Sequence, residues 1–117
     1  MSELTVKVRE VPNAVVLDFS GKITIGEGAS LFRDQIREML DSGHKNILVN
    51  FESVSYVDSA GLGQLVGCFA TAAHRGGQIK LLNVGHRIGE LLHITHLDSV
   101  FQVFANERVA LHSFNDD

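Results

Sequence analysis

Two short apolar runs constrain the fold of this chain more than any other part of its sequence. The first lies within residues 46–51 (Asn-Ile-Leu-Val-Asn-Phe) and the second within residues 79–82 (Ile-Lys-Leu-Leu). Neither run alternates apolar with polar residues, which is typical of strands that are covered on both faces of a sheet. Between the two runs, apolar residues recur at the spacing of a helix, at Leu62, Leu65, Val66, Phe69 and Ala73. Strand, helix and strand within about 35 residues predict a right-handed crossover between two parallel interior strands.

The residues that precede this unit predict a hairpin followed by an amphipathic helix. Residues 4–9 alternate apolar with polar side chains, as in an outer strand with one wet face, and Pro12-Asn13 has the composition of a turn. A more apolar strand follows over residues 14–19 and is expected to end at Gly21, so that the two strands pair as a hairpin. From residue 26 to residue 40 the apolar side chains fall on one helical face.

The last third of the chain predicts shorter elements. A weak helix is expected around residues 88–92, a strand around residues 100–104, and a final short helix capped by Asn106. Taken together, the elements predict a single α/β domain over residues 1–117. In this domain an N-terminal hairpin leads into a largely parallel sheet with about four helices.

Composition and charge exclude several classes of function. The chain has 117 residues, of which 44% are hydrophobic, and this is enough apolar material for one core. The formal net charge is −4, and Lys and Arg are scattered singly, so we expect no nucleic acid partner. No signal peptide and no bilayer-spanning apolar stretch is present, so we expect a cytoplasmic protein without membrane insertion. The single cysteine, Cys68, lies within a helical pattern and is expected to be packed.

The segment from Val54 to Gly63 combines a strand end, a hydroxyl group and a helix start. Asp58 and Ser59 are both residue types that favour the N-cap position of a helix. Alanine and glycine follow at residues 60, 61 and 63, so another protein or a phosphate donor can approach the backbone closely. Two interpretations of Ser59 stay open: a cap whose hydroxyl satisfies a backbone donor, or a regulatory phosphorylation site on a docking surface. The second is our leading hypothesis.

The common catalytic and cofactor motifs are absent from this segment. A nucleophile elbow needs glycine where Val57 stands, a dinucleotide-binding loop needs a third glycine where Val66 stands, and no Gly-Lys-Ser or Gly-Lys-Thr occurs. His93 and His96 lack companion ligands at metal-binding spacing. Asp18 stands alone, whereas receiver domains need an acidic pair to hold magnesium beside their phosphoacceptor aspartate. We therefore expect no catalytic residue, no cofactor and no metal site.

Residues 57–63 (Val-Asp-Ser-Ala-Gly-Leu-Gly) resemble the Asp-Ser-x-Gly-Leu-Gly signature of the STAS family, the sulfate-transporter and anti-sigma-factor-antagonist family, in its bacterial stand-alone branch. The surrounding elements agree with this resemblance. The hairpin that closes at Gly21, the helix to Leu40, the strand at 47–51 and the tail at 97–104 follow in the family's order. The resemblance covers nearly the whole chain and implies a single STAS-like domain.

The resemblance also implies a partner-switching regulator rather than an enzyme. An anti-sigma-factor antagonist of this kind binds a serine-kinase anti-sigma factor while it is unphosphorylated, and so frees the sigma factor. The kinase uses ATP to phosphorylate the serine that matches Ser59, and a metal-dependent serine phosphatase resets it. The residues implied to bind the partner are Asp58, Ser59, Ala60, Gly61, Leu62 and Gly63, together with Lys22 and Thr24.

Two departures from the family pattern concern partner choice. The family often has Gly-Glu-Leu-Asp where residues 21–24 are Gly-Lys-Ile-Thr, and often has aspartate where Asn50 stands. The resemblance implies that both positions lie near the docking surface. A second function is compatible with the same fold: a STAS subunit of a lipid-transport ABC complex, or a scaffold in a signalling assembly, in which the serine is never modified.

Overall fold

The fold is built on one five-stranded sheet with the strand order β1-β2-β3-β4-β5. The computed structural model describes residues 3–116. The first two strands, β1 (Leu4–Val11) and β2 (Ala14–Ile23), form the expected antiparallel hairpin. All remaining pairs are parallel: β2 pairs with β3 (Asn46–Val57), β3 pairs with β4 (Gln78–Leu82), and β4 pairs with β5 (Val103–Phe104). The predicted hairpin and largely parallel sheet are therefore confirmed.

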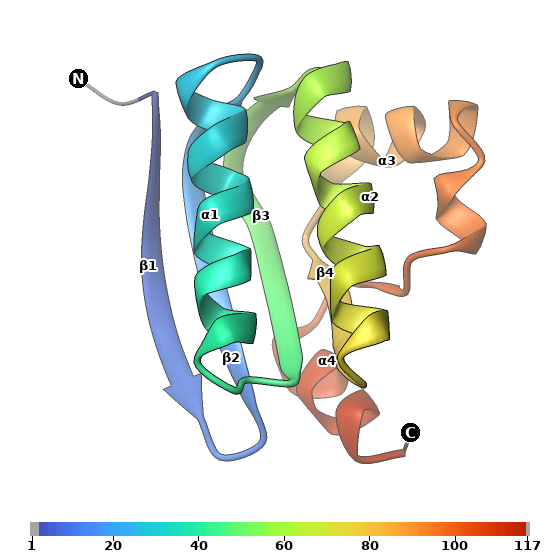
Figure 1. Cartoon of the computed structure of the whole chain (residues 1–117). Helices are drawn as coiled ribbons and strands as arrows, with labels where there is room; N and C mark the ends of the chain where they lie inside the picture. Colours follow the sequence, from blue (N-terminus) through green and yellow to red (C-terminus); the bar gives the residue numbers. More distant parts are fainter. Residues whose placement is uncertain (1–2, 117) are drawn as a thin grey trace.

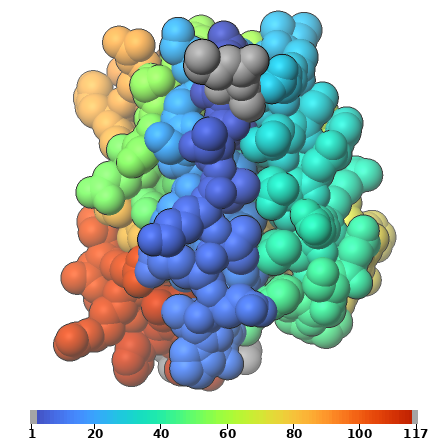
Figure 2. Space-filling model, turned by 90° about the vertical axis from the view of Figure 1, so that its left-hand side faces the viewer, coloured from blue at the N-terminus to red at the C-terminus, as the bar shows by residue number. Residues whose placement is uncertain are grey.

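Helices cover both faces of this sheet. α1 (Glu27–Asp41) and α2 (Ser59–His74) lie side by side on one face (Figure 1). Seen from the β1 edge, α1 lies on one side of the sheet and α4 (Glu107–Ser113) lies on the other (Figure 2). The buried residues of α3 (Gly85–Ile94), Ile88 and Leu92, belong to the same core as those of α1 and α2. Two short 3-10 helices, Leu97–Ser99 and Phe114–Asp116, follow α3 and α4. No helix within residues 3–116 is long and apolar enough to cross a membrane.

Apolar side chains fill both interfaces of the sheet with its helices. Under α1 and α2, Phe19 of β2 packs against Phe32 of α1 with ring centroids 4.8 Å apart. Cys68 is buried in the same core, as its helical position predicted. On the opposite face, a smaller cluster that includes Val16, Leu48 and Ala110 packs under α4. The runs around residues 47–49 and 79–82 are interior strands because neighbours pair with them on both edges.

Two strands differ from their predicted bounds. β2 does not end at Gly21 but continues to Ile23. Gly21 has a φ of 116°, and the β2–β3 register shifts beside it, so the glycine bends the strand without ending it. This bend lets the Lys22 amide donate to the Glu3 carbonyl at 3.0 Å. The predicted strand at residues 100–104 is shorter than expected, because only Val103–Phe104 pairs with β4.

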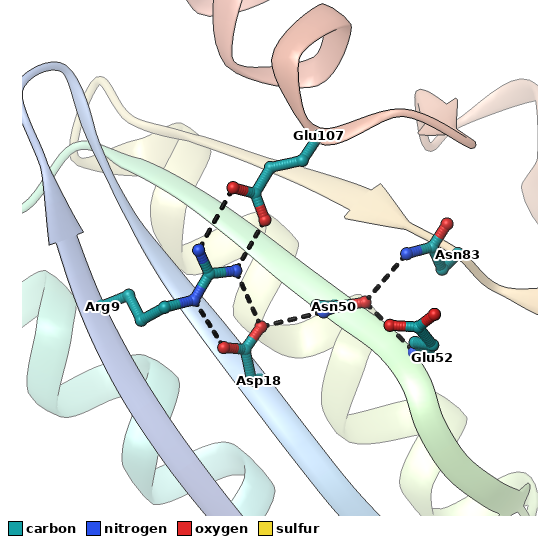
Figure 3. A network of polar contacts seen from close by, with 6 residues as sticks. All are labelled: Arg9, Asp18, Asn50, Glu52, Asn83 and Glu107. Atoms are coloured by element: carbon teal, nitrogen blue, oxygen red, sulfur yellow. Dashed lines mark hydrogen bonds and ion pairs between the residues drawn. The ribbon is translucent and has the colours of Figure 1, made fainter.

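A polar row that includes the side chains of Arg9, Asp18, Asn50 and Glu107 crosses the sheet face opposite α1 and α2 (Figure 3). Arg9 of β1 donates to both carboxylate oxygens of Asp18 on β2, at 2.6 and 3.0 Å. The same guanidinium donates to the Glu107 carboxylate at the start of α4, at 3.1 and 2.6 Å. Hydrogen bonds from Arg9 hold the pKa of Asp18 below its ordinary value. The row thus attaches the first turn of α4 to the two N-terminal strands.

Candidate functional site

The candidate site lies where two parallel strands end side by side. Ile23, the last residue of β2, pairs with Val57, the last residue of β3. Two connections therefore leave the sheet next to each other: the β2–α1 loop at residues 24–26, and the turn at Asp58 that enters α2. Figure 1 shows the start of α1 and the start of α2 at this end of the molecule. Parallel strands commonly place functional groups at their carboxyl ends in this way.

Asp58 links the two connections with its carboxylate. It is the N-cap of α2, and its Oδ1 accepts from the Gly61 amide at 2.8 Å. Its Oδ2 accepts from the Ile25 amide in the β2–α1 loop, also at 2.8 Å. The hydrogen bond from Gly61, followed by that from Ile25, lowers the pKa of Asp58, because both stabilise the ionised carboxylate. One side chain therefore caps α2 and fixes the neighbouring loop.

Ser59 is the first residue of α2 and is exposed. Its hydroxyl makes no hydrogen bond within residues 3–116, since Asp58 takes the capping role that the sequence left open between the two residues. The hydroxyl therefore contributes no capping bond to the helix. Ser59 stands on the molecular surface at the positive end of the helix dipole.

The small residues after Ser59 divide into two kinds. Gly61 is buried, and a Cβ at this position would lie only 2.3 Å from the Ile23 carbonyl oxygen, so its missing side chain lets α2 start close to β2. Leu62 is buried in the main core. Gly63 is exposed, and a Cβ there would meet no described atom within 4 Å. Of the predicted partner-binding residues on α2, Ser59 and Gly63 thus face outward, Ala60 is half-buried, and the other two serve the fold.

The two predicted residues on the β2–α1 side lie at the same end of the sheet. Lys22 is exposed one residue before the end of β2. Thr24 is half-buried, its hydroxyl donates to the Glu3 carboxylate at 3.2 Å, and its carbonyl accepts from the Ala29 amide at 2.8 Å. Asn50 is different. It lies in the polar row on β3, seven residues before Val57, and donates to Asp18 at 2.8 Å, so the structure does not place it beside Ser59.

No group of three or more His, Cys, Asp or Glu side chains that could hold a metal ion occurs among residues 3–116. The two histidines of the predicted α3 region are separated by the end of that helix. His93 lies in its last turn and contacts the Asp98 carboxylate at 2.8 Å, whereas His96 lies beyond it with a φ of 62°. The contact between His93 and Asp98 joins the end of α3 to the 3-10 helix that follows it.

Comparison with known proteins places this architecture in a family. The profile of the STAS domain matches residues 5–110. The chain belongs to the STAS-domain family. An anti-sigma-B factor antagonist of Bacillus subtilis (strain 168) is 29% identical over 102 residues, which are 87% of this chain and 92% of that protein. The resemblance that the sequence carried in residues 57–63 is thereby confirmed.

Solved structures of STAS proteins share the fold. An anti-sigma factor antagonist from Mycobacterium paratuberculosis superposes with a TM-score of 0.85 at 20% identity, over 97% of this chain and 95% of that one. SpoIIAA, an anti-sigma factor antagonist solved in its unphosphorylated form, gives a TM-score of 0.80 at 22% identity, over 97% of this chain and 98% of that one. The architecture of both antagonists matches that of this STAS protein.

Sequence reasoning missed one conspicuous residue of this site, Ile25. Its side chain is 80% exposed, the largest exposed fraction among the large hydrophobic residues described. It lies in the β2–α1 loop and donates its amide to Asp58, the neighbour of Ser59. One signal was available in the sequence: an isoleucine directly before Gly26 fits neither the strand pattern before it nor the helical pattern after it.

Proposed function

We propose that this STAS protein is an anti-sigma-factor antagonist that is switched by phosphorylation of Ser59. In its unphosphorylated form it binds a serine-kinase anti-sigma factor and thereby frees the sigma factor. The kinase phosphorylates Ser59 with ATP, binding ends, and a serine phosphatase restores the first state. The protein is a substrate and a binding partner in the cytoplasm and performs no catalysis of its own.

The exposed hydroxyl of Ser59 is the observation that carries this proposal. A kinase needs a serine whose hydroxyl is accessible, and a switch needs a serine that the fold can spare. Ser59 meets both conditions, because it is exposed and because Asp58 caps α2 in its place. The anti-sigma factor antagonists among its relatives support the same biological role.

A phosphate on Ser59 meets two opposing local effects. The positive end of α2 favours an anion by about 0.3–1 kcal/mol. The ionised Asp58 next to it disfavours the phosphate by about 1 kcal/mol at a separation near 4 Å in water. The two effects are of similar size, so we expect the fold and its stability to change little on phosphorylation.

The interface is where the same phosphate has a large effect. A phosphoserine carries about −1.5 to −2 charges, and these lose their water when a partner covers Ser59. A partner surface shaped for a neutral hydroxyl has no cationic or hydrogen-bonding group placed to stabilise the phosphate, and burying an unpaired charge is costly. Phosphorylation therefore acts on binding rather than on folding.

The test is incubation of the protein with a purified serine-kinase anti-sigma factor from its own organism and ATP, followed by intact mass and peptide mapping. We expect one added phosphate, on Ser59, and none on Ser59→Ala. Ser55→Ala is the matched control, because Ser55 is also exposed and lies four residues earlier on β3. Lack of phosphorylation by every such kinase of the organism would contradict the switch and favour a STAS subunit of a transport complex or a scaffold.

A further inference from the structure

The β2–α1 loop presents an apolar side chain that the fold does not use. Ile25 is 80% exposed and belongs to neither hydrophobic core. Single exposed apolar residues are common on protein surfaces and need no explanation by themselves. Ile25 differs from those because of where it lies and because of how firmly its backbone is held.

The backbone on both sides of Ile25 is fixed by hydrogen bonds. The Thr24 carbonyl accepts from the Ala29 amide at 2.8 Å, and the Gly26 carbonyl accepts from the Ser30 amide at 3.1 Å. The amide of Ile25 itself donates to Asp58 at 2.8 Å. The loop is therefore joined to the first turn of α1 on one side and to the N-cap of α2 on the other. A side chain on such a loop loses little further freedom when a partner binds it.

The position of Ile25 connects it to the switch residue. Asp58 binds the Ile25 amide and directly precedes Ser59, so a partner that covers the Ser59 hydroxyl also reaches the β2–α1 loop. Interfaces concentrate their binding energy in a few anchor residues that enter well-packed pockets of the partner. Gly63 and Ser59 provide close approach and a hydroxyl, and Ile25 supplies the large apolar side chain that they lack.

We propose that Ile25 is an apolar anchor that enters a hydrophobic socket of the serine-kinase anti-sigma factor, and that Asp58 positions it there. This proposal rests on the proposed function. Asp58 thereby has two structural tasks, to cap α2 and to hold the anchor beside Ser59. Partner choice then depends on a residue outside the Asp-Ser-x-Gly-Leu-Gly motif, 34 positions before Ser59 in the chain.

Calorimetric titration with the anti-sigma factor that phosphorylates Ser59 tests the anchor. Ile25→Ala should weaken binding by about 10- to 100-fold, as expected for removing most of a buried Ile side chain, whereas Ile25→Val should stay close to the wild type. Val109→Ala is the matched control, because Val109 is 55% exposed on α4 and should leave binding unchanged. All three variants should melt as the wild type does, since neither side chain is buried. In phosphorylation assays Ile25→Ala should raise KM for the protein substrate and leave kcat unchanged.

A double-mutant cycle tests the positioning role of Asp58. Asp58→Asn has one carbonyl oxygen in place of two carboxylate oxygens, so it cannot accept from both Gly61 and Ile25 with the same geometry. If Asp58 acts through Ile25, the loss caused by Ile25→Ala should be smaller in the Asp58→Asn background than in the wild type.

The outcomes separate the two proposals. If wild-type affinity persists in Ile25→Ala while phosphorylation of Ser59 still abolishes binding, the anchor is wrong and the switch stands. Additive losses in the cycle would overturn the positioning role of Asp58. If no anti-sigma factor of the organism binds or phosphorylates the wild-type protein, the proposed function fails and the anchor fails with it.

Discussion

The two helices that cover the same face of the sheet differ on their outward sides. Both bury apolar residues against the sheet, among them Phe32 and Ile36 on α1 and Leu62 and Leu65 on α2. The outward side of α1 is charged, as is usual for a helix in contact with water, with exposed residues Asp34, Arg37, Glu38 and Asp41. The outward side of α2 consists of Ser59, Gly63, Val66, Gly67, Ala70, Ala73 and, at its last position, His74, and no charged residue stands in its first fifteen positions.

This difference separates the demands of folding from those of binding. The inward residues are sufficient to hold both helices on the sheet, so the fold sets no requirement for an uncharged outer side on α2. Depletion of charged residues is instead typical of the central part of a protein–protein interface. We therefore interpret the outer side of α2, which begins at Ser59, as the docking side of the molecule.

The largest expected effect comes from adding bulk to each outward side. Gly63→Trp should weaken binding to the kinase anti-sigma factor by about 100-fold or more, because the side chain would stand where the partner approaches the helix. Asp34→Trp places the same side chain on the outward side of α1 and should leave the affinity unchanged. Titrations of both variants decide the matter: equal losses, or no loss in either, would remove the distinction between the helices.

A smaller effect is expected on stability from two glycines of the same turn. Gly61→Ala forces a Cβ toward the Ile23 carbonyl and should lower the free energy of unfolding by about 1–3 kcal/mol. Gly63→Ala meets no neighbour and should raise it by up to about 1 kcal/mol, because alanine favours a helix. Urea denaturation of both variants measures the difference. If both variants unfold alike, the assignment of Gly61 to the fold and Gly63 to the surface is wrong.

Acid should loosen α4 before it loosens the middle of α1 or the middle of α2. The Glu107 carboxylate attaches α4 to the sheet by accepting from Arg9. Hydrogen bonds from the same Arg9 to Asp18 lower the folded pKa of Asp18. A carboxylate with a lowered pKa stabilises the fold above its unfolded value, near 3.9, and this stability disappears as the pH falls through the folded pKa. Below about pH 4 we therefore expect faster amide exchange in α4 than at neutral pH, with little change in the middle of α1.

Asp18→Asn is the control for this smallest effect. It removes the titrating group, so exchange in α4 should already be faster at neutral pH and should depend less on acid. The pKa of Asp58 is also lowered, so its protonation in acid will loosen the β2–α1 loop that it holds through Ile25. That change lies at the starts of α1 and α2 and is separate from α4. An α4 that stays protected in acid would show that apolar packing around Ala110 is enough to hold it.

The sequence predicted those features that depend on local pattern. The apolar runs at residues 47–49 and 79–82, the helical spacing after Leu62 and the cap residues at Asp58 and Ser59 all act over a few positions. They were therefore sufficient for the parallel sheet, its crossover helix and the place of the candidate site. The choice between two adjacent cap residues needed the geometry of the turn, which only the structure supplies.

The features that the sequence did not predict depend on contacts between distant residues. The bond between Asp58 and Ile25 joins residues 33 positions apart, and that between Arg9 and Glu107 joins residues 98 positions apart. The sequence pattern placed Gly61 on a bare docking surface. In the structure Gly61 of α2 instead lies against the Ile23 carbonyl of β2, which is distant in the sequence. The continuation of β2 past Gly21 likewise depends on pairing with the distant end of β3, where Lys22 pairs with Tyr56 and Ile23 with Val57.

The central claim is that phosphorylation of Ser59 changes the docking side of the molecule without changing its fold. Calorimetric affinity for the anti-sigma factor, measured together with amide exchange on both forms of the protein, tests it most directly. We expect the affinity to fall by several kcal/mol on phosphorylation, with Ser59→Ala still binding and Ser59→Asp binding weakly, while exchange protection in α2 and the melting temperature stay nearly the same. Widespread loss of protection in the phosphorylated form, in proportion to the lost affinity, would show that the switch works by unfolding α2 and would contradict this account.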